Sequence, residues 1–256
     1  MGKTVYAFWC RHPSRRNFGD ALTPWLIKKI TGRHPTFIRP EVSLEKYFVV
    51  GSIIGYAVEH CTVWGAGIIS RADRISPRAK LLAVRGPLTQ ARAVECSAYC
   101  PEVCGDPALL LPRFYRPIPG TRGGIGVVPH YLDKPRFMAS CQLARPLRLI
   151  DIQDPIESVI DQLVSCDFIV SSSLHAIIAA NAYGVPAMWG KFNGSHFGDD
   201  SKFADYYLSV GQEPQAPVML GDGPLDPDEL RRHVRPLEMT IDLDRLWNAC
   251  PFRCEA

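Results

Sequence analysis

The stretch Phe168–Tyr183, FIVSSSLHAIIAANAY, decides the fold of this chain. Its first four residues, Phe168–Ser171, predict a short buried strand because the run is mostly apolar and β-branched. Ser171 begins a run of three serines, and a serine hydroxyl can cap the helix that the apolar run from Leu174 to Tyr183 predicts. A strand that leads directly into a helix is the building unit of a parallel α/β sheet.

The same alternation extends over most of the chain. Strands are predicted at Val5–Phe8, Tyr47–Gly51, Cys61–Gly65, Leu81–Val84, Glu102–Gly105, Gly124–Pro129, Leu147–Ile150, Phe168–Ser171 and Pro186–Trp189. Helices are predicted at Ala21–Thr31, Pro87–Val94, Ile156–Val164, Leu174–Tyr183, Pro227–Val234 and Leu243–Ala249. Strands that alternate with helices indicate parallel sheets with helices on their faces.

A stretch rich in proline and glycine, Pro112–Gly124, interrupts this alternation and predicts an interdomain linker. We therefore expect an α/β protein with two Rossmann-like domains that face each other across a cleft. The first domain covers residues 1–120, and the second covers residues 121–256 and ends in a helix.

The composition narrows the class of protein. The chain has 256 residues, of which 46% are hydrophobic and 21% charged, and this balance is typical of a globular protein. The net charge of +3 suits an anionic ligand but is too small to indicate nucleic-acid binding. No apolar stretch is long enough to span a membrane, and Met1–Trp9 does not resemble a secretory leader. We expect a soluble cytoplasmic protein.

Four predicted junctions carry polar residues where a helix begins: Asp20, Arg85-Gly86-Pro87, Gly105-Asp106-Pro107 and Ser171–His175. Ligands of open parallel sheets bind where strands end and helices begin, because helix N-termini offer unpaired N–H groups and a positive dipole end. Asp20 is predicted to cap the helix at Ala21. Taken singly, each junction also has a structural interpretation: a helix cap at Asp20 and Asp106, which we favour there, an ion pair at Arg85, and a packed or capping histidine at His175.

Several common functional motifs are absent from the sequence. Gly65-Ala66-Gly67 lacks the third glycine of the dinucleotide-binding fingerprint, and the chain contains no nucleotide-binding P-loop. It also contains no zinc-protease motif and no nucleophile elbow of the α/β-hydrolases. The chemistry therefore has to come from the four junctions.

Together, the junctions resemble the polysaccharide pyruvyl transferase family. The matching segments are Asn17–Asp20, Val63–Gly67, Val84–Thr89, Gly105–Pro107, Val128–His130, Ser171–His175 and Asn181–Pro186. The residues of these motifs are similar to those of the ketal pyruvyl transferases of xanthan-type exopolysaccharides. The resemblance spans roughly Asn17 to Tyr207.

This resemblance implies a fold of the GT-B glycosyltransferase type. It implies phosphoenolpyruvate as the donor substrate, with no metal and no nucleotide cofactor. It also implies an oligosaccharide acceptor carried on a polyprenyl diphosphate, at the inner face of the bacterial inner membrane. Contact with the membrane is then expected only through the acceptor lipid, and nucleic acid is not expected as a partner.

Phosphoenolpyruvate carries a phosphate and a carboxylate, so its site needs cations and helix N-termini. We expect Arg85 to bind the donor, with Lys202 as a second cation. The resemblance adds donor contacts from three further residues: Asn17, Ser173 and Leu174.

Ketal formation also needs proton transfer. We expect His175 to act as the general acid or as the partner of the phosphate, and Asp20 or Asp106 to receive a hydroxyl proton. His130 is the candidate for contact with the acceptor. Two rival interpretations remain open at this stage: a GT-B-type nucleotide-sugar glycosyltransferase, and a non-catalytic carbohydrate- or anion-binding protein.

Overall fold

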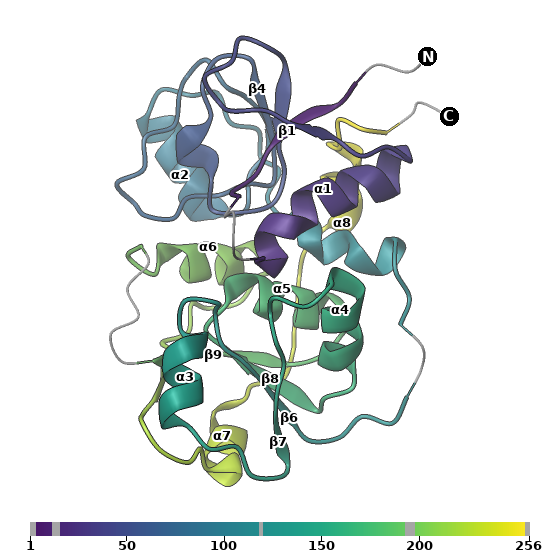
Figure 1. Ribbon diagram of the computed structural model, residues 1–256. Helices are drawn as coiled ribbons and strands as arrows, with labels where there is room; N and C mark the ends of the chain where they lie inside the picture. Colours follow the sequence, from purple (N-terminus) through teal and green to yellow (C-terminus); the bar gives the residue numbers. More distant parts are fainter. Residues whose placement is uncertain (1–3, 12–15, 118–119, 193–197, 254–256) are drawn as a thin grey trace.

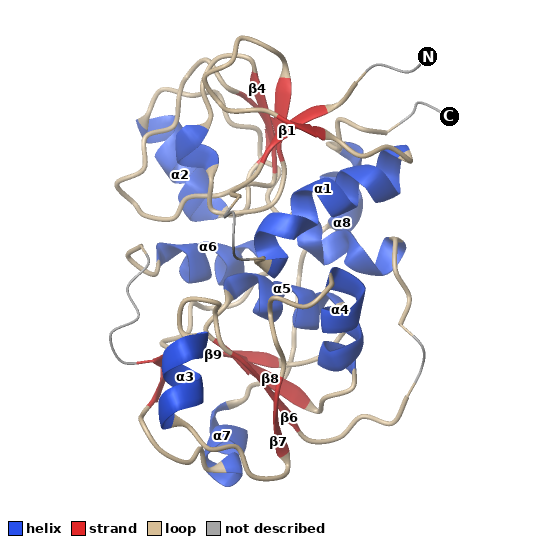
Figure 2. Cartoon of the chain, in the orientation of Figure 1, coloured by secondary structure: helices blue, strands red, loops and turns tan. Residues whose placement is uncertain are grey.

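The computed structural model describes residues 4–11, 16–117, 120–192 and 198–253. It contains two parallel β-sheets at opposite ends of the molecule, with a layer of helices between them (Figure 1). The coloured cartoon shows the strands gathered in these two groups and the helices in the middle and at the sides (Figure 2). The chain is therefore an α/β protein with two Rossmann-like halves, an architecture consistent with the GT-B type.

The first sheet has the strand order β2-β1-β3-β4-β5. Its strands are β1 (Tyr6–Phe8), β2 (Thr36–Phe37), β3 (Lys46–Phe48), β4 (Cys61–Trp64) and β5 (Lys80–Ala83). All four pairings are parallel. β4 is buried along its whole length, as expected for a central strand covered on both faces.

The second sheet has the strand order β10-β9-β8-β6-β7 and is also parallel. Its strands are β6 (Ile125–Val128), β7 (Leu147–Leu149), β8 (Phe168–Ser171), β9 (Ala187–Phe192) and β10 (Val218–Leu220). Parallel strands place their carboxyl ends at one edge of a sheet. The loops that leave these edges carry the polar junctions found in the sequence.

The α-helices are α1 (Phe18–Thr31), α2 (Pro87–Glu95), α3 (Lys134–Ser140), α4 (Ile156–Val164), α5 (Leu174–Ala182), α6 (Ser201–Ser209), α7 (Pro227–His233) and α8 (Leu243–Asn248). Two short 3₁₀ helices, η1 (Ile54–Tyr56) and η2 (Pro107–Arg113), lie in the first half of the chain. Among the described residues, no helix combines the length and apolar character that a membrane crossing needs.

Most predicted elements are confirmed, with three corrections. The first helix begins at Phe18 and not at Ala21. Glu102–Gly105 forms a single bridge between Val84 and Cys104 and no strand, because the chain turns immediately into η2. The first residues of the predicted linker, Pro112 and Arg113, belong to η2.

The largest hydrophobic cluster joins the two halves of the molecule. It contains Leu22 of α1, Leu110 of η2, Val159 of α4 and Ile177 of α5, all of them buried. Helix α5 packs against η2, and α1 packs against both α4 and α5. The helical layer between the sheets is therefore a shared core, not a solvent-filled gap.

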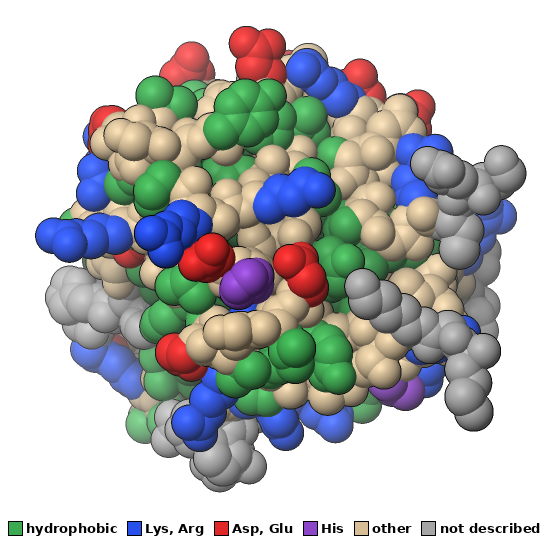
Figure 3. Space-filling view, turned by 90° about the horizontal axis from the view of Figure 1, so that it is seen from above, with side chains coloured by type: hydrophobic (Ala, Val, Ile, Leu, Met, Phe, Trp, Pro, Cys, Tyr) green, Lys and Arg blue, Asp and Glu red, His purple; other side chains and the backbone are tan. Residues whose placement is uncertain are grey.

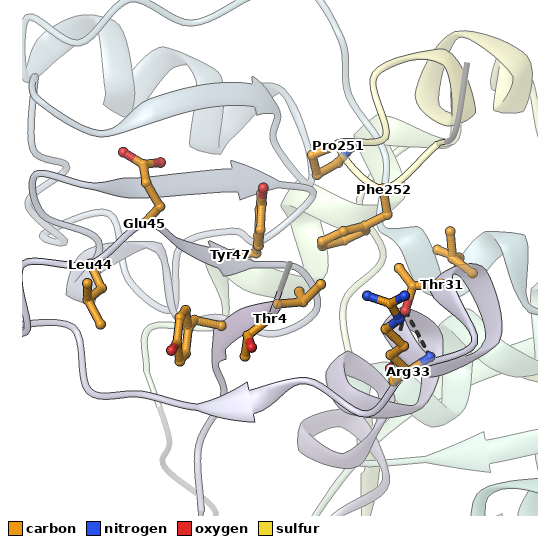
Figure 4. Close-up of a pocket in the computed structure, with 11 residues that line it drawn as sticks. Thr4, Thr31, Arg33, Leu44, Glu45, Tyr47, Pro251 and Phe252 are labelled. Atoms are coloured by element: carbon orange, nitrogen blue, oxygen red, sulfur yellow. Dashed lines mark hydrogen bonds between the residues drawn. The ribbon is translucent and has the colours of Figure 1, made fainter. Parts of the chain in front are cut away.

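The C-terminal segment returns to the first sheet. The indole Nε1 of Trp64 in β4 donates a hydrogen bond of 2.9 Å to the carbonyl of Leu246 in α8. Phe252 packs edge-on against Tyr47, with ring centroids 4.7 Å apart, beside an apolar groove that Pro251 also lines (Figure 4). The terminal helix that we assigned to the second domain thus contacts the first sheet.

Charges of both signs are interspersed on the surface. Figure 3 shows acidic and basic side chains alternating with apolar ones on the end of the molecule that carries the first sheet. One example of such pairing is the ion pair between Arg78 and Glu59, at 3.2 Å. Exposed pairs of this kind contribute little to stability.

Candidate functional site

The carboxyl edges of the two sheets face each other across a small polar cavity. Residues that follow strands of both sheets line it: Cys10, Asn17, Asp20, Gly51, Ser52, Ile53, Ile69, His130, Ser173, Leu174, His175 and Lys202. Helices α1 and α5 begin at the cavity. Their first N–H groups have no partner within the helix, and their dipoles are positive at this end. The cavity is thus suited to an anion.

The cavity wall on the α1 side contains Asn17 and Asp20. Asn17 is the N-cap of α1, and Asp20 lies in its first turn, so the prediction that Asp20 is the cap was wrong. The amide of Asn17 donates a hydrogen bond of 2.9 Å to Oδ2 of Asp20. Burial raises the pKa of the Asp20 carboxyl, although Asn17 and His175 oppose this effect. A carboxylate of raised pKa is a better proton acceptor in a reaction near neutral pH.

His175 lies in the first turn of α5, between Asp106 and Gly19. Its Nε2 is 3.6 Å from Oδ2 of Asp106, and neither atom has a hydrogen-bond partner among the described residues. A Cβ atom on Gly19 would collide with the imidazole, so α1 approaches His175 this closely only because residue 19 is glycine. The imidazole is 13% exposed, whereas Asp106 is fully buried behind it.

Asp106 has a second, structural function. It is the N-cap of η2, and its Oδ1 accepts a hydrogen bond from the backbone N–H of Ala108. This bond fixes the carboxylate, so its other oxygen faces the imidazole from the side away from the cavity. Asp106 can therefore orient the imidazole of His175 without lining the cavity itself.

Lys202 also lines the cavity, from the start of α6. Burial and the nearby charge of Arg85 lower the pKa of its ammonium group to about 8. His130, at the end of β6, also lines the cavity, and burial and Lys202 lower its pKa to about 4. His130 is therefore neutral near pH 7, while most Lys202 side chains still carry their charge.

Arg85 does not line the cavity. Its guanidinium is fully buried, and its Nε donates to Oδ2 of Asp205 at 3.0 Å. Its other two nitrogens donate to the hydroxyl of Ser52 at 2.8 Å and to the carbonyl of Ile68. In this geometry Arg85 reaches the cavity wall through Ser52, and its expected role in donor binding stays a prediction. Through these bonds Arg85 fixes the hydroxyl of Ser52 in the cavity wall. It also fixes the position of α6, because Asp205 is a residue of that helix.

Seven of the nine site residues expected from the sequence line this one cavity: Asn17, Asp20, His130, Ser173, Leu174, His175 and Lys202. Arg85 and Asp106 stand one layer behind it. Sequence reasoning missed Ser52, Cys10 and Asp205. Ser52 directly follows a predicted strand and could have been found by that signal, whereas the partner of Arg85 is 120 residues away in sequence.

Comparison with known proteins gives the family. A model of the polysaccharide pyruvyl transferase family matches residues 43–189, more than half of the chain. The chain belongs to the polysaccharide pyruvyl transferase family. It is also 31% identical over 211 residues to an uncharacterised protein, L143, of Acanthamoeba polyphaga mimivirus, an alignment that covers 77% of this chain and 72% of that protein. No solved structure matches the chain.

Membership of this family indicates a transferase that acts with pyruvyl groups on polysaccharide. The matched region contains Ser52, Arg85, Asp106, His130 and His175. Asn17, Asp20 and Lys202 lie outside it, and the fold brings them into the same cavity.

Proposed function

We propose that this chain transfers the pyruvyl group of phosphoenolpyruvate to a sugar diol, forming a cyclic ketal and releasing phosphate. The observation that carries the proposal is the convergence of His175, Lys202 and the N-termini of α1 and α5 on one small cavity. A compact dianionic phosphate ester with a neighbouring carboxylate fits such a set of groups.

Donor binding uses the ammonium of Lys202 and the backbone N–H groups that begin α1 and α5. Asn17, Ser173 and Leu174 contribute the walls of this subsite. Ser52 adds a hydroxyl whose orientation Arg85 fixes. The proposed reaction consumes phosphoenolpyruvate as a substrate and requires no further cofactor.

In the first chemical step, His175 as an imidazolium donates a proton to the methylene carbon of phosphoenolpyruvate. The central carbon becomes electrophilic, and one sugar hydroxyl adds to it while Asp20 accepts the hydroxyl proton. Asp106 orients the imidazole from behind, 3.6 Å from its Nε2, and does not touch the substrate. A positioned acid–base group of this kind contributes roughly 10²–10⁴ in rate.

In the second step, the bond from the central carbon to the phosphate oxygen breaks, and the second sugar hydroxyl closes the ketal ring. The proton of that hydroxyl leaves with the phosphate. His130 is neutral and also lines the cavity, and because its Nδ1 accepts a hydrogen bond from the N–H of Leu132, its Nε2 can donate one to the acceptor. We place the acceptor on a lipid-linked oligosaccharide of an exopolysaccharide precursor. The protein would work in the cytoplasm, against the inner face of the membrane.

Thermal unfolding with and without phosphoenolpyruvate tests donor binding. A ligand at about 100 times its Kd stabilises the native state by about 2.7 kcal/mol, so the melting temperature should rise. A panel of sugar nucleotides should leave it unchanged. A rise with a sugar nucleotide and none with phosphoenolpyruvate would identify a glycosyltransferase instead.

His175→Gln tests the chemical step. Phosphate release in the presence of acceptor should fall by at least about a hundredfold, because the acid is lost while the side chain stays polar and of similar size. His233→Gln, on α7 and outside the cavity lining, is the matched control and should keep full activity. If the rate of phosphate release falls less than about tenfold in His175→Gln, His175 is not the general acid of the reaction.

A further inference from the structure

An aromatic groove lies next to the candidate cavity, at the carboxyl edge of the first sheet. It is lined by Phe8, Trp9, Phe37 and Tyr56, with Arg11 and Arg39 among its polar residues. The rings contact each other: Phe8 and Tyr56 have centroids 5.7 Å apart, and Trp9 meets Phe37 edge-on at 5.2 Å. The groove therefore has a continuous aromatic wall.

Two chain segments connect the aromatic groove to the cavity. Cys10 lines both of them. Ile53 lines the cavity, and the short helix η1 that follows it ends at Tyr56 in the groove. The groove and the cavity thus share a wall at Cys10 and are neighbours on the first half of the chain.

The groove presents its aromatic surface to solvent. Tyr56 as a whole residue is 57% exposed, which is unusual for a large aromatic residue that only fills a core. The guanidinium of Arg11 lies over the ring of Phe37, 4.7 Å from its centroid. Flat aromatic faces beside arginine donors match a pyranose ring, which has an apolar C–H face and hydroxyl groups at its rim.

A second groove lies at the opposite end of α1 and is lined by Thr31, Arg33, Tyr47 and Phe252 (Figure 4). Helix α1 has 14 residues, so its ends are about 20 Å apart. That distance is too large for a sugar in the second groove to present a diol to His175 at the start of α5. The aromatic groove has no such gap.

We propose that the aromatic groove is the acceptor subsite and binds a neutral hexopyranose ring of the glycan, stacked on the exposed ring of Tyr56. The bound ring directs its diol past Cys10 toward Asp20 and His175. This inference rests on the proposed function, because it assigns a binding site to the acceptor sugar, the second substrate of that reaction.

The test uses the full chain and the methyl glycosides of glucose, mannose and galactose. Binding is followed by saturation-transfer NMR in the absence of phosphoenolpyruvate. At least one glycoside should bind, and Tyr56→Ala should weaken its affinity by about threefold to tenfold, the amount expected for one lost aromatic contact. The exposed Tyr56 is not part of the buried core, so the variant should fold.

Tyr99→Ala is the matched control, because Tyr99 is 82% exposed and does not line the groove. It should bind the glycoside as the unchanged protein does. In steady-state assays, Tyr56→Ala should raise KM for the acceptor and leave kcat and the thermal shift with phosphoenolpyruvate within about twofold.

The inference is overturned if the glycoside binds equally well to Tyr56→Ala, or if no glycoside binds while phosphoenolpyruvate still stabilises the protein. In both cases the proposed donor site remains supported, and the proposed acceptor subsite is wrong. If glycosides bind in the groove but phosphoenolpyruvate does not stabilise the protein, the groove is supported and the proposed transfer reaction fails.

Discussion

The charge of Lys202 is set by its surroundings, and this gives donor binding a defined pH dependence. Its ammonium has a pKa of about 8, lowered by burial and by Arg85. A bound phosphate raises this pKa again, so binding takes up a proton. Affinity for phosphoenolpyruvate should therefore be constant below pH 8. Above pH 8 it should fall, by up to about tenfold per pH unit, as the ammonium loses its proton.

Calorimetric titration from pH 7 to 9.5 measures this dependence, since the phosphate is fully ionised throughout that range. Lys202→Met should bind weakly at every pH and show no decline above pH 8. Lys202→Arg keeps its charge and should also lose the decline. An unchanged pH profile in Lys202→Met would show that another group causes it.

Single residues also show which features of the site could be predicted from the sequence. The arrangement Ser171–His175 placed a histidine in the first turn of a helix, and the structure confirms that position because it depends only on local strand and helix patterns. The same reasoning from local patterns predicted that Arg85 binds the donor. It could not see Asp205, which lies in the second half of the chain and forms a buried ion pair with the guanidinium.

Helix α6 is held in place by its contacts with the start of α2. Oδ1 of Asp205 accepts a hydrogen bond from the N–H of Thr89, and its Oδ2 accepts bonds from the hydroxyl of Thr89 and from Arg85. A Cβ atom on Gly86 would collide with the backbone of Asp205, so the two helices touch at this point. Because Lys202 is on the same helix, the pair positions the cavity's ammonium group.

Removing one partner of this buried pair should be costly. Arg85→Leu leaves the carboxylate of Asp205 without its counterion and should lower the free energy of unfolding by roughly 3–5 kcal/mol. Urea denaturation measures this loss. The double change Arg85→Leu with Asp205→Leu should cost less than the sum of the two single changes, because it leaves no unpaired charge.

Arg78→Leu is the control for this experiment, since its ion pair with Glu59 is exposed and should contribute little. If the Arg85–Asp205 pair also positions Lys202, donor binding should change as well as stability. At a temperature where Arg85→Leu is still folded, its affinity for phosphoenolpyruvate should fall because α6 is no longer held. Equal stability of Arg85→Leu and Arg78→Leu would contradict the role of the pair.

The elements that the sequence missed are those with weak local signals. β2 has two residues and β10 has three, and both lie at the edge of a sheet, where apolar patterning is weakest. Helix α6 was not predicted, although Lys202 was chosen from it. Its buried residues include Asp205, which interrupts the apolar face that predicts a helix, and the reason for that aspartate lies in α2.

The shared core decides how the whole molecule should unfold. Leu22, Leu110, Val159 and Ile177 belong to one buried cluster, although they come from both halves of the chain. The sequence break near residue 120 suggested two domains that face each other across a cleft. The terminal helix α8, however, returns from the second half of the chain to Trp64 in the first. Cutting at the predicted boundary would expose this cluster and leave Trp64 without its bond.

We therefore expect a single cooperative unfolding transition. Differential scanning calorimetry should give one peak, with equal calorimetric and van 't Hoff enthalpies, as for one cooperative unit. Leu22→Ala, which opens a cavity in the shared cluster at a typical cost of about 2–5 kcal/mol, should shift the whole peak to lower temperature. If the peak instead splits and only one part moves, the halves fold separately and the interface contributes little to stability.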